Sequence, residues 1–152
     1  ALVLCGRNAA LKDAIDALGA SDARALRVRA VGFTRDVAAL MAAATCVLAK
    51  PGPGVVAESL ALRRPLVFPL FAVGGMRGVM AQEREVLEHV IRAGVGEVCE
   101  HEHALERVLE SSIEARAALR LMERRAALLP PNRAVYQVAQ FLRTMPVQTA
   151  FA

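Results

Sequence analysis

The chain has 152 residues, of which 55% are hydrophobic and only 4% aromatic. That length suffices for one domain with a sizeable core and is too short for two ordinary ones. No run of about 18 apolar residues occurs, so no membrane-spanning helix is predicted. The net charge of +4 arises in residues 1–75, with nine basic and five acidic residues against ten of each in residues 76–152. This surplus suits an anionic ligand or surface, although an ordinary solvated surface explains it equally well.

The start of the chain and its cysteines indicate its context. Residues 1–5 contain no initiator methionine, basic region or cleavage site, so we expect a fragment or a processed product. Cys5, Cys46 and Cys99 lack CxxC spacing and sit in or beside apolar runs, as buried free thiols do. This usage favours a reducing compartment, cytosolic or plastid-like.

Short β-type runs alternate with helical patterns along the first hundred residues. Strands are predicted at residues 2–5, 27–31, 45–49, 65–68 and 95–99, and helices at 9–18, 36–43, 55–62 and 82–93. The strands are apolar without clean alternation, which is typical of a parallel sheet covered on both faces. The order predicts an α/β fold with a Rossmann-like, doubly wound parallel sheet.

The last third is predicted to be helical. One or two helices span residues 102–127, Pro130 and Pro131 break the pattern, and Asn132 can cap a last helix that runs to about residue 143. Residues 144–152 are expected to form a loose tail. Arg116, Arg120 and Arg124 share one helix face. A solvated face explains them, and contact with anionic lipid headgroups, at about 1 kcal/mol per arginine, is the functional alternative.

The segment KPGPGVVAE, from Lys50 to Glu58, follows a predicted strand and opens a helix. Gly52 and Gly54 leave room for a ligand near the backbone, while the two prolines stiffen the turn. The free N–H groups after Gly54 and the helix dipole favour a phosphate or diphosphate. The pattern is neither GxxxxGK[ST] nor GxGxxG, so a P-loop NTPase or a hydride-transfer fold is unsupported.

Polar side chains near two helix starts are candidate sugar ligands. Glu58 lies about one turn into its helix, where a carboxylate can accept hydrogen bonds from both ribose hydroxyls or simply complement the helix dipole. Gln82 and Glu83 open the next helix and are suited to sugar hydroxyls, although acidic residues are ordinary there. His101 and His103 have no third ligand at metal spacing and are expected to be surface histidines. No metal and no cofactor is predicted.

Five ordered motifs resemble the C-terminal half of a two-lobed glycosyltransferase: VLCGRN ending at Asn8, VGFT at Thr34, KPGPGVVAE at Glu58, AQE at Glu83 and AGVG at Gly96. The family is that of MurG and the monogalactosyldiacylglycerol synthases, and the CGRN and GPG segments resemble the synthases more. The resemblance covers about residues 2–100. It implies that residues 1–143 form the C-terminal, nucleotide-sugar-binding lobe of a GT-B fold, without its first strand and without the N-terminal acceptor lobe.

The resemblance implies a site for a UDP-sugar. Phe33 and Thr34 would hold the uracil through backbone groups, Glu58 would bind the ribose, and the glycine loop would face the diphosphate. Gln82 and Glu83 would bind the donor sugar. The implied ligands are Gly6, Arg7, Asn8, Phe33, Thr34, Gly52, Pro53, Gly54, Val55, Val56, Glu58, Gln82 and Glu83. The general base is expected in the N-terminal lobe, so no catalytic residue is assigned.

Two departures from the family pattern concern the donor sugar. The family motif GQExxN appears as AQEREV, so Val86 stands where the family has asparagine. Residues 71–79 are longer than the family loop, and aligning residues 74–77 to the motif is an alternative that loses both polar residues. The spacing from Gln82 to Gly94 favours the first alignment.

The resemblance implies that the chain is the donor-binding part of a hexosyltransferase that moves a sugar from a UDP-sugar to a membrane lipid. The most favoured donor and acceptor are UDP-galactose and diacylglycerol. The chain alone would bind the donor without turnover. Its partners would be the donor, the lipid acceptor, a membrane surface and the N-terminal lobe of the same or another chain, with no nucleic acid. It would be a peripheral membrane protein, at the plastid envelope if a galactolipid synthase and otherwise at the cytoplasmic membrane. The alternatives are a UDP-sugar 2-epimerase lobe and a non-catalytic nucleotide-binding or partner module.

Overall fold

The computed structural model describes residues 1–19 and 27–145. The chain divides into two compact units, of which the first spans residues 1–40 and the second begins at Met41. Each unit is of the α/β type with parallel strands, which confirms the predicted fold class. A single doubly wound sheet through both units stays a prediction, as does the single lobe over residues 1–143. Most of the predicted loose tail, residues 146–152, lies outside the described residues.

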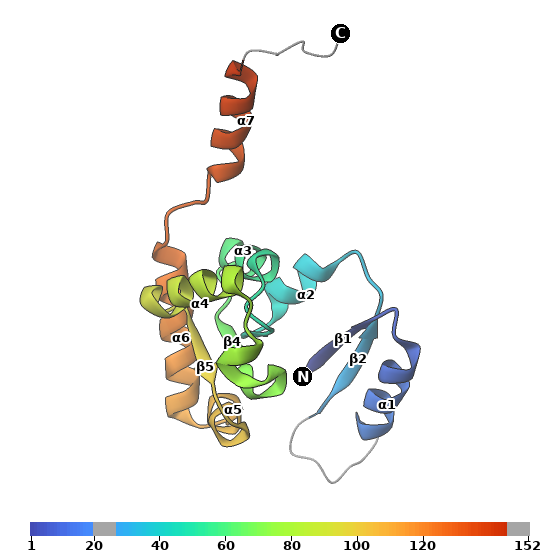
Figure 1. The fold of residues 1–152 in the computed structure, drawn as a ribbon. Coiled ribbons are helices and arrows are strands. Elements are labelled where there is room, and N and C mark those ends of the chain that lie inside the picture. Colours follow the sequence, from blue (N-terminus) through green and yellow to red (C-terminus); the bar gives the residue numbers. More distant parts are fainter. Residues whose placement is uncertain (20–26, 146–152) are drawn as a thin grey trace. The chain divides into compact units, whose positions relative to one another are not determined.

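The first unit is a parallel strand pair with a helix between the strands in sequence (Figure 1). Strands β1 (Leu2–Gly6) and β2 (Arg29–Gly32) pair in parallel, and α1 (Ala9–Gly19) packs on both. Asp16 ties the helix to the sheet, because its Oδ1 accepts a hydrogen bond from the Ala30 N–H at 3.3 Å while its Oδ2 lies 2.6 Å from Lys12 Nζ. Helix α2 (Val37–Ala43) follows.

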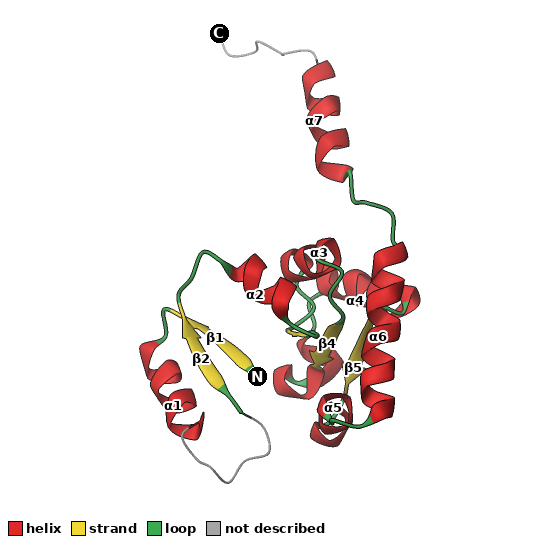
Figure 2. Ribbon diagram, turned by 180° about the vertical axis from the view of Figure 1, so that it is seen from behind, coloured by secondary structure: helices red, strands yellow, loops and turns green. Residues whose placement is uncertain are grey.

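The second unit is built on three parallel strands in the order β3 (Val47–Leu48), β4 (Leu66–Pro69) and β5 (Gly96–Cys99). Helix α3 (Pro53–Ala61) connects β3 to β4. Two 3-10 turns, Leu70–Val73 and Gly75–Gly78, and helix α4 (Ala81–Ala93) connect β4 to β5. The strands and helices of this unit follow the order that the apolar runs predict (Figure 2).

Strand β4 is buried on both faces, which explains its continuous apolar sequence. Leu66 and Phe68 belong to a core cluster with residues of α3 and α4, including Val56 and Leu87. Val67, between them in sequence, belongs instead to a second cluster with residues of α5 and α6. Successive side chains of a strand point to opposite faces, so helices cover both sides of this sheet. The prediction of a sheet covered on both faces is confirmed for the second unit.

Residues 102–145 contain three helices: α5 (Glu102–Leu109), α6 (Ile113–Leu128) and α7 (Ala134–Thr144). The predicted stretch over residues 102–127 is therefore two helices, and the Ser112 side chain starts the second by accepting a hydrogen bond from the Ala115 N–H. The N-cap residue of α7 is Arg133 rather than the predicted Asn132, although the Asn132 side chain accepts a hydrogen bond from the Ala134 N–H at the start of that helix. None of the described helices is both long and apolar enough to cross a membrane.

Gly96 opens β5 where β4 and α4 approach closely. A Cβ at this position would lie 2.6 Å from Val90 Cγ1 and 2.8 Å from the carbonyl oxygen of Leu66. Replacing Gly96 by alanine is therefore expected to lower the free energy of unfolding by about 1–3 kcal/mol, the usual cost of overpacking. Urea denaturation measures this loss, with Glu97→Ala in the same strand as the control. Wild-type stability in the Gly96 variant would contradict the close approach of β4 and β5.

Candidate functional site

The glycine-proline loop forms the start of α3 directly after β3. Gly52 is the N-cap residue in an extended conformation, and Pro53 is the first helical residue. The Gly52 carbonyl accepts a hydrogen bond from the Val56 N–H at 3.1 Å. No side chain of the described residues caps this helix, so the N–H groups of Gly54 and Val55 remain open to a ligand. Such a helix start attracts an anion.

Gly54 has a helical position that any residue could occupy. A Cβ built on it meets no atom within 4 Å, and neither Gly52 nor Gly54 has a positive φ. Glycine in a helix costs about 1 kcal/mol relative to alanine, so the fold itself gains nothing from Gly54. The open space beside its backbone fits the close ligand approach expected from the sequence.

An ion pair joins this helix start to the start of α4. Lys50 Nζ lies 3.0 Å from Glu83 Oε1, and Glu83 Oε2 accepts a hydrogen bond from the Met80 N–H at 3.1 Å. The Glu83 side chain is 2% exposed, whereas that of Lys50 is 56% exposed. The hydrogen bond from Lys50, followed by that from Met80, lowers the pKa of Glu83. A cation with solvent access is thus fixed two residues before Gly52.

The lowered pKa of Glu83 makes the contribution of this ion pair depend on pH. A carboxylate with a depressed folded-state pKa stabilises the fold above its unfolded pKa, about 4.5, and loses this effect as the pH falls through the folded value. We therefore expect Glu83→Gln to melt several degrees below the wild type at neutral pH and the two melting temperatures to converge in acid. Thermal melts across this pH range measure the gap, with exposed Glu88→Gln as the control. A gap that stays constant into strong acid would contradict the assignment.

Glu58 and Gln82 are both exposed. Glu58 lies in the second turn of α3, and the first turn contains no acidic residue. Because the helix dipole acts mainly within the first turn, complementing that dipole explains Glu58 poorly. No hydrogen bond or ion pair within the described part of the chain engages its side chain. Gln82 Nε2 lies 3.5 Å from the Met80 sulfur, and both residues stay predicted ligands of sugar hydroxyls.

The two departures from the family pattern have structural explanations. Val86 is partly buried and packs against the core cluster that contains Phe68, so an apolar side chain suits this position. In the longer loop, Gly74 and Gly75 have φ values of 84° and 69°, and the chain then forms a 3-10 turn. That turn lies before α4, whereas Gln82 and Glu83 lie in the first turn of the helix as the preferred alignment expects.

In the first unit, the candidate residues lie together at the carboxyl ends of the paired strands. Gly6 pairs with Gly32 in the parallel register, so the residues that follow β1 and β2 are neighbours. The Arg7 guanidinium carbon lies 4.9 Å from the centre of the Phe33 ring, a cation–π contact. Phe33 is 60% exposed and therefore presents a ring and a cation to solvent.

Two candidates in this unit also serve the local fold. The Asn8 Oδ1 accepts a hydrogen bond from the Leu11 N–H at 3.0 Å and caps α1. The Thr34 Oγ1 accepts one from the Asp36 N–H at 3.0 Å. These contacts explain both residues without a ligand, so a role of the first unit's candidates in nucleotide binding stays a prediction.

Lys50 is not among the ligands predicted from the sequence. The available indications were a lysine directly after a predicted strand and before the PGPG loop, and a glutamate near the start of the predicted helix over residues 82–93. A glutamate three residues into a helix often accepts a hydrogen bond from the N-cap N–H, as Glu83 does. Only the packing of α3 against α4 reveals that the two charges meet.

Two histidines and the three cysteines have the following surroundings in the structure. The His101 Nδ1 accepts a hydrogen bond from the Ala104 N–H and caps α5, while His103 Nδ1 lies 3.3 Å from a Glu106 oxygen. No group of three or more His, Cys, Asp or Glu side chains gathers within residues 1–19 and 27–145. The three cysteines are free; Cys5 and Cys99 are buried as predicted, whereas Cys46 is only partly buried, and burial raises the pKa of the Cys99 thiol.

Comparisons with known proteins give relatives of one kind. The chain is 30% identical over 95 residues to monogalactosyldiacylglycerol synthase 2, chloroplastic, of Arabidopsis thaliana, covering 62% of this chain and 18% of that protein. It is 24% identical over 138 residues to synthase 1 of the same plant, covering 90% of this chain and 24% of that protein. The chain thus spans about a quarter or less of the length of these relatives. The similarity supports a relationship to glycosyltransferases.

No family model matches the chain. Among solved structures, the chain is similar to the glycosyltransferase SnogD from Streptomyces nogalater, with 19% identity and a TM-score of 0.43. That similarity covers 82% of this chain and 34% of SnogD. The α/β class rests on the strand order and packing described above rather than on this similarity.

Proposed function

We propose that this chain is the donor-binding part of a hexosyltransferase that moves a sugar from a UDP-sugar to a membrane lipid. The observation that carries the proposal is the uncapped start of α3, with the Lys50 cation held just before it by Glu83. UDP-galactose and diacylglycerol are the first candidate substrates, because the relatives are named monogalactosyldiacylglycerol synthases.

Each candidate residue of the second unit then has a proposed role. The N–H groups of Gly54 and Val55 and the Lys50 ammonium bind the diphosphate, and Glu58 accepts hydrogen bonds from the ribose. Gln82 contacts the donor sugar. Because both oxygens of Glu83 are already engaged, its main role is to position Lys50. During transfer, the N–H groups and the ammonium directed at the departing UDP stabilise the negative charge that develops on it.

For the first unit, we propose that Phe33 and Thr34 contact the uracil and that Gly6, Arg7 and Asn8 are further ligands of the nucleotide-sugar. The exposed Phe33 ring with its bound guanidinium supports a contact with a planar group. The candidates of the first unit and those of the second unit are separate proposals, and each is tested by its own variants. Arg7→Ala tests the first unit's candidates through UDP affinity, since it removes the cation above the Phe33 ring and leaves the sequence of α3 unchanged.

The proposed partners are the lipid acceptor, a membrane surface and an acceptor lobe that carries the general base. The proposed location is the envelope of a plastid, in a reducing compartment, because the relatives are named as chloroplastic. The three free cysteines agree with such a compartment.

A non-catalytic nucleotide-binding module is the second candidate, and Val86 favours it. Its side chain packs on the core and offers no hydrogen bond to a sugar where the family has asparagine. Such a module would bind UDP and UDP-sugars with equal affinity. A third candidate is a lobe of a UDP-sugar 2-epimerase. Release of free epimerised sugar by the complete enzyme would reveal that activity.

Titration calorimetry with a nucleotide series tests the proposed function. Uridine, UMP, UDP, ADP and UDP-galactose are each titrated into the 152-residue chain. The proposal expects UDP to bind about tenfold or more tightly than UMP, since the second phosphate reaches the α3 start and Lys50. It also expects UDP-galactose to exceed UDP. Equal affinity for UMP and UDP would contradict a diphosphate site, and equal affinity for UDP and UDP-galactose would favour the non-catalytic module.

A further inference from the structure

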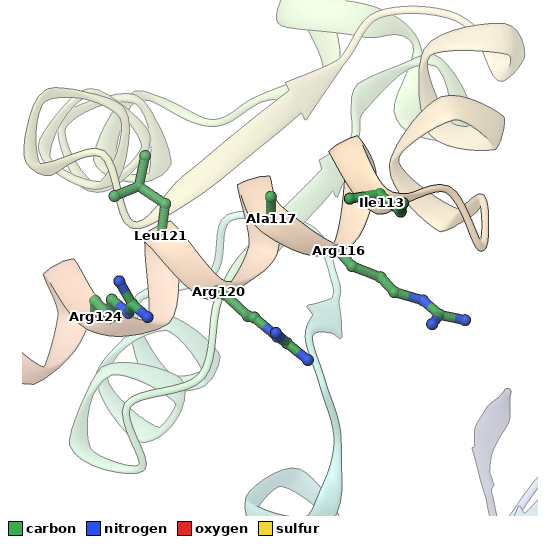
Figure 3. A pocket seen from close by; sticks show the side chains of 6 residues that line it. All are labelled: Ile113, Arg116, Ala117, Arg120, Leu121 and Arg124. Atoms are coloured by element: carbon green, nitrogen blue, oxygen red, sulfur yellow. The ribbon is translucent and has the colours of Figure 1, made fainter.

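Helix α6 presents a row of arginines to solvent beside an apolar row. The two rows line a hollow of about 400 Å³ (Figure 3). Its lining consists of three arginines and three apolar residues, each set four residues apart: Arg116, Arg120 and Arg124, and Ile113, Ala117 and Leu121. Ile113 is 83% exposed and Leu121 is 48% exposed. Within residues 1–19 and 27–145, no ion pair neutralises these three guanidinium groups, so the surface favours an acidic partner.

Helix α5 carries a matching row of carboxylates. Glu102, Glu106 and Glu110 are also four residues apart and exposed, and Glu110 is the C-cap residue of the helix. The buried Ala104 is two residues from both Glu102 and Glu106, about 200° around the helix, so these carboxylates lie on its outer side. His103 Nδ1, 3.3 Å from a Glu106 oxygen, is the only ion-pair partner of this row in the described part of the chain.

The basic row and the acidic row lie on the same side of the second unit. Val108 of α5 and Leu119 of α6 pack with Val67 of β4 in one core cluster. The two helices therefore cover the same face of the sheet, and their exposed charged sides are directed away from it. Because a helix rises about 1.5 Å per residue, both rows repeat about every 6 Å. The two rows thus have equal spacing and opposite charge, and among the described residues no ion pair joins one row to the other.

We propose that two copies of this chain associate through these rows, with α5 of each copy against α6 of the other. A two-fold axis makes both contacts at once, because the same surface serves both copies. Arg120 and Glu106 are the central members of their rows, so they face each other whichever way the helices run. The contact also covers the exposed Ile113 and Leu121. Single exposed ion pairs contribute little, whereas a network of several pairs is favourable. The chain itself provides the complementary row, which favours a second copy over an unrelated acidic protein.

The inference goes beyond nucleotide binding, and its test contains no nucleotide. Sedimentation velocity of the 152-residue chain at micromolar concentration measures association. We expect a dimer at about 0.01 M salt and a monomer at about 1 M salt, where the Debye length falls to about 3 Å and the rows no longer attract each other. A wild-type chain that sediments as a monomer at low salt would overturn the proposal.

Charge reversal at the centre of each row provides the matched comparison. Arg120→Glu and Glu106→Arg are each expected to raise the dissociation constant of the dimer at least about tenfold, since like charges then face each other in both contacts. An equimolar mixture of the two variants is expected to restore a dimer of about wild-type affinity, because each reversed residue then faces an opposite charge. Arg133→Glu and Glu88→Arg, exposed residues outside the rows, make the same changes in net charge and are expected to leave association within about twofold of the wild type.

Two further results would overturn the inference. A mixture that associates no better than either single variant would show that Arg120 and Glu106 do not face each other. A dimer that persists at about 1 M salt would show that the charged rows do not hold it together. Since both side chains are exposed, both variants are expected to keep the wild-type melting temperature. UDP affinity is expected to stay unchanged in both, so failure of this inference is distinguishable from failure of the proposed function.

Discussion

Replacing Glu58 by alanine is expected to weaken UDP binding about 5- to 150-fold, or about 1–3 kcal/mol. Glu58 is exposed in the second turn of α3, so its carboxylate is free to accept hydrogen bonds from both ribose hydroxyls. Such charge-assisted bonds are stronger than bonds between neutral groups, and their loss leaves the hydroxyls to water. Titration calorimetry with UDP measures the change.

The same carboxylate is expected to matter little for folding. An exposed side chain without a described partner contributes little to stability, so Glu58→Ala is expected to melt like the wild type. Glu58→Gln keeps one acceptor oxygen and is expected to lose less affinity than the alanine variant. Glu88→Ala, an exposed carboxylate on α4, matches the charge change and serves as the control. Unchanged UDP affinity in a folded Glu58→Ala variant would remove this residue from the site.

Replacing Gly54 by alanine is expected to change stability and binding in opposite directions. The new Cβ meets no protein atom within 4 Å, and alanine favours a helix over glycine by up to about 1 kcal/mol. The variant is therefore expected to unfold at higher urea concentration. The same methyl group would occupy the space proposed for the diphosphate, so UDP affinity is expected to fall about tenfold or more.

Ala57→Gly is the matched control for this variant, because it makes the reverse exchange in the same helix. It is expected to lower stability while leaving UDP affinity close to that of the wild type. A Gly54→Ala variant that is more stable and still binds UDP normally would place the ligand away from the helix start. Reduced stability would instead show that a protein atom fills the space beside Gly54.

Most of the secondary structure could be predicted from the sequence, because local apolar patterns and the residues at helix ends determine most of it. Continuous apolar runs mark strands that helices cover on both faces, as β4 shows with Leu66, Val67 and Phe68. Glycine, proline and asparagine mark the ends of helices to within a residue: α7 has Arg133 as its N-cap, one residue after the predicted Asn132. The sequence indicates only a loop over residues 71–79, whereas the chain forms two 3-10 turns there, Leu70–Val73 and Gly75–Gly78. The glycines of this segment indicate that the chain turns but not which kind of turn it forms.

The candidate site was predictable only in part. The helix start at Gly52 follows from sequence order, because a strand that ends before PGPG must turn into the next helix. The Lys50–Glu83 ion pair joins residues 33 positions apart and depends on how α3 packs against α4. The Arg7–Phe33 contact likewise depends on the pairing of β1 with β2. Periodicity contains no information on such distant meetings.

Val86 stands at a position where core packing and the proposed sugar contact make different demands. An apolar side chain there fits the core packing of α4. The hydrogen bond that an asparagine would offer to a sugar is absent. We therefore expect UDP-galactose and UDP-glucose to bind with similar affinity, since the exposed Gln82 is left as the proposed sugar ligand.

We propose that the start of α3 binds the diphosphate of UDP, and the shifts of its backbone amides on addition of UDP test this claim. In a ¹⁵N–¹H correlation spectrum titrated with UDP, we expect the amides of Gly54 and Val55 to shift most and to saturate with a single affinity. UMP is predicted to move these two amides much less, because it lacks the second phosphate. If millimolar UDP left the amides of Gly54 and Val55 in place, the claim would be contradicted.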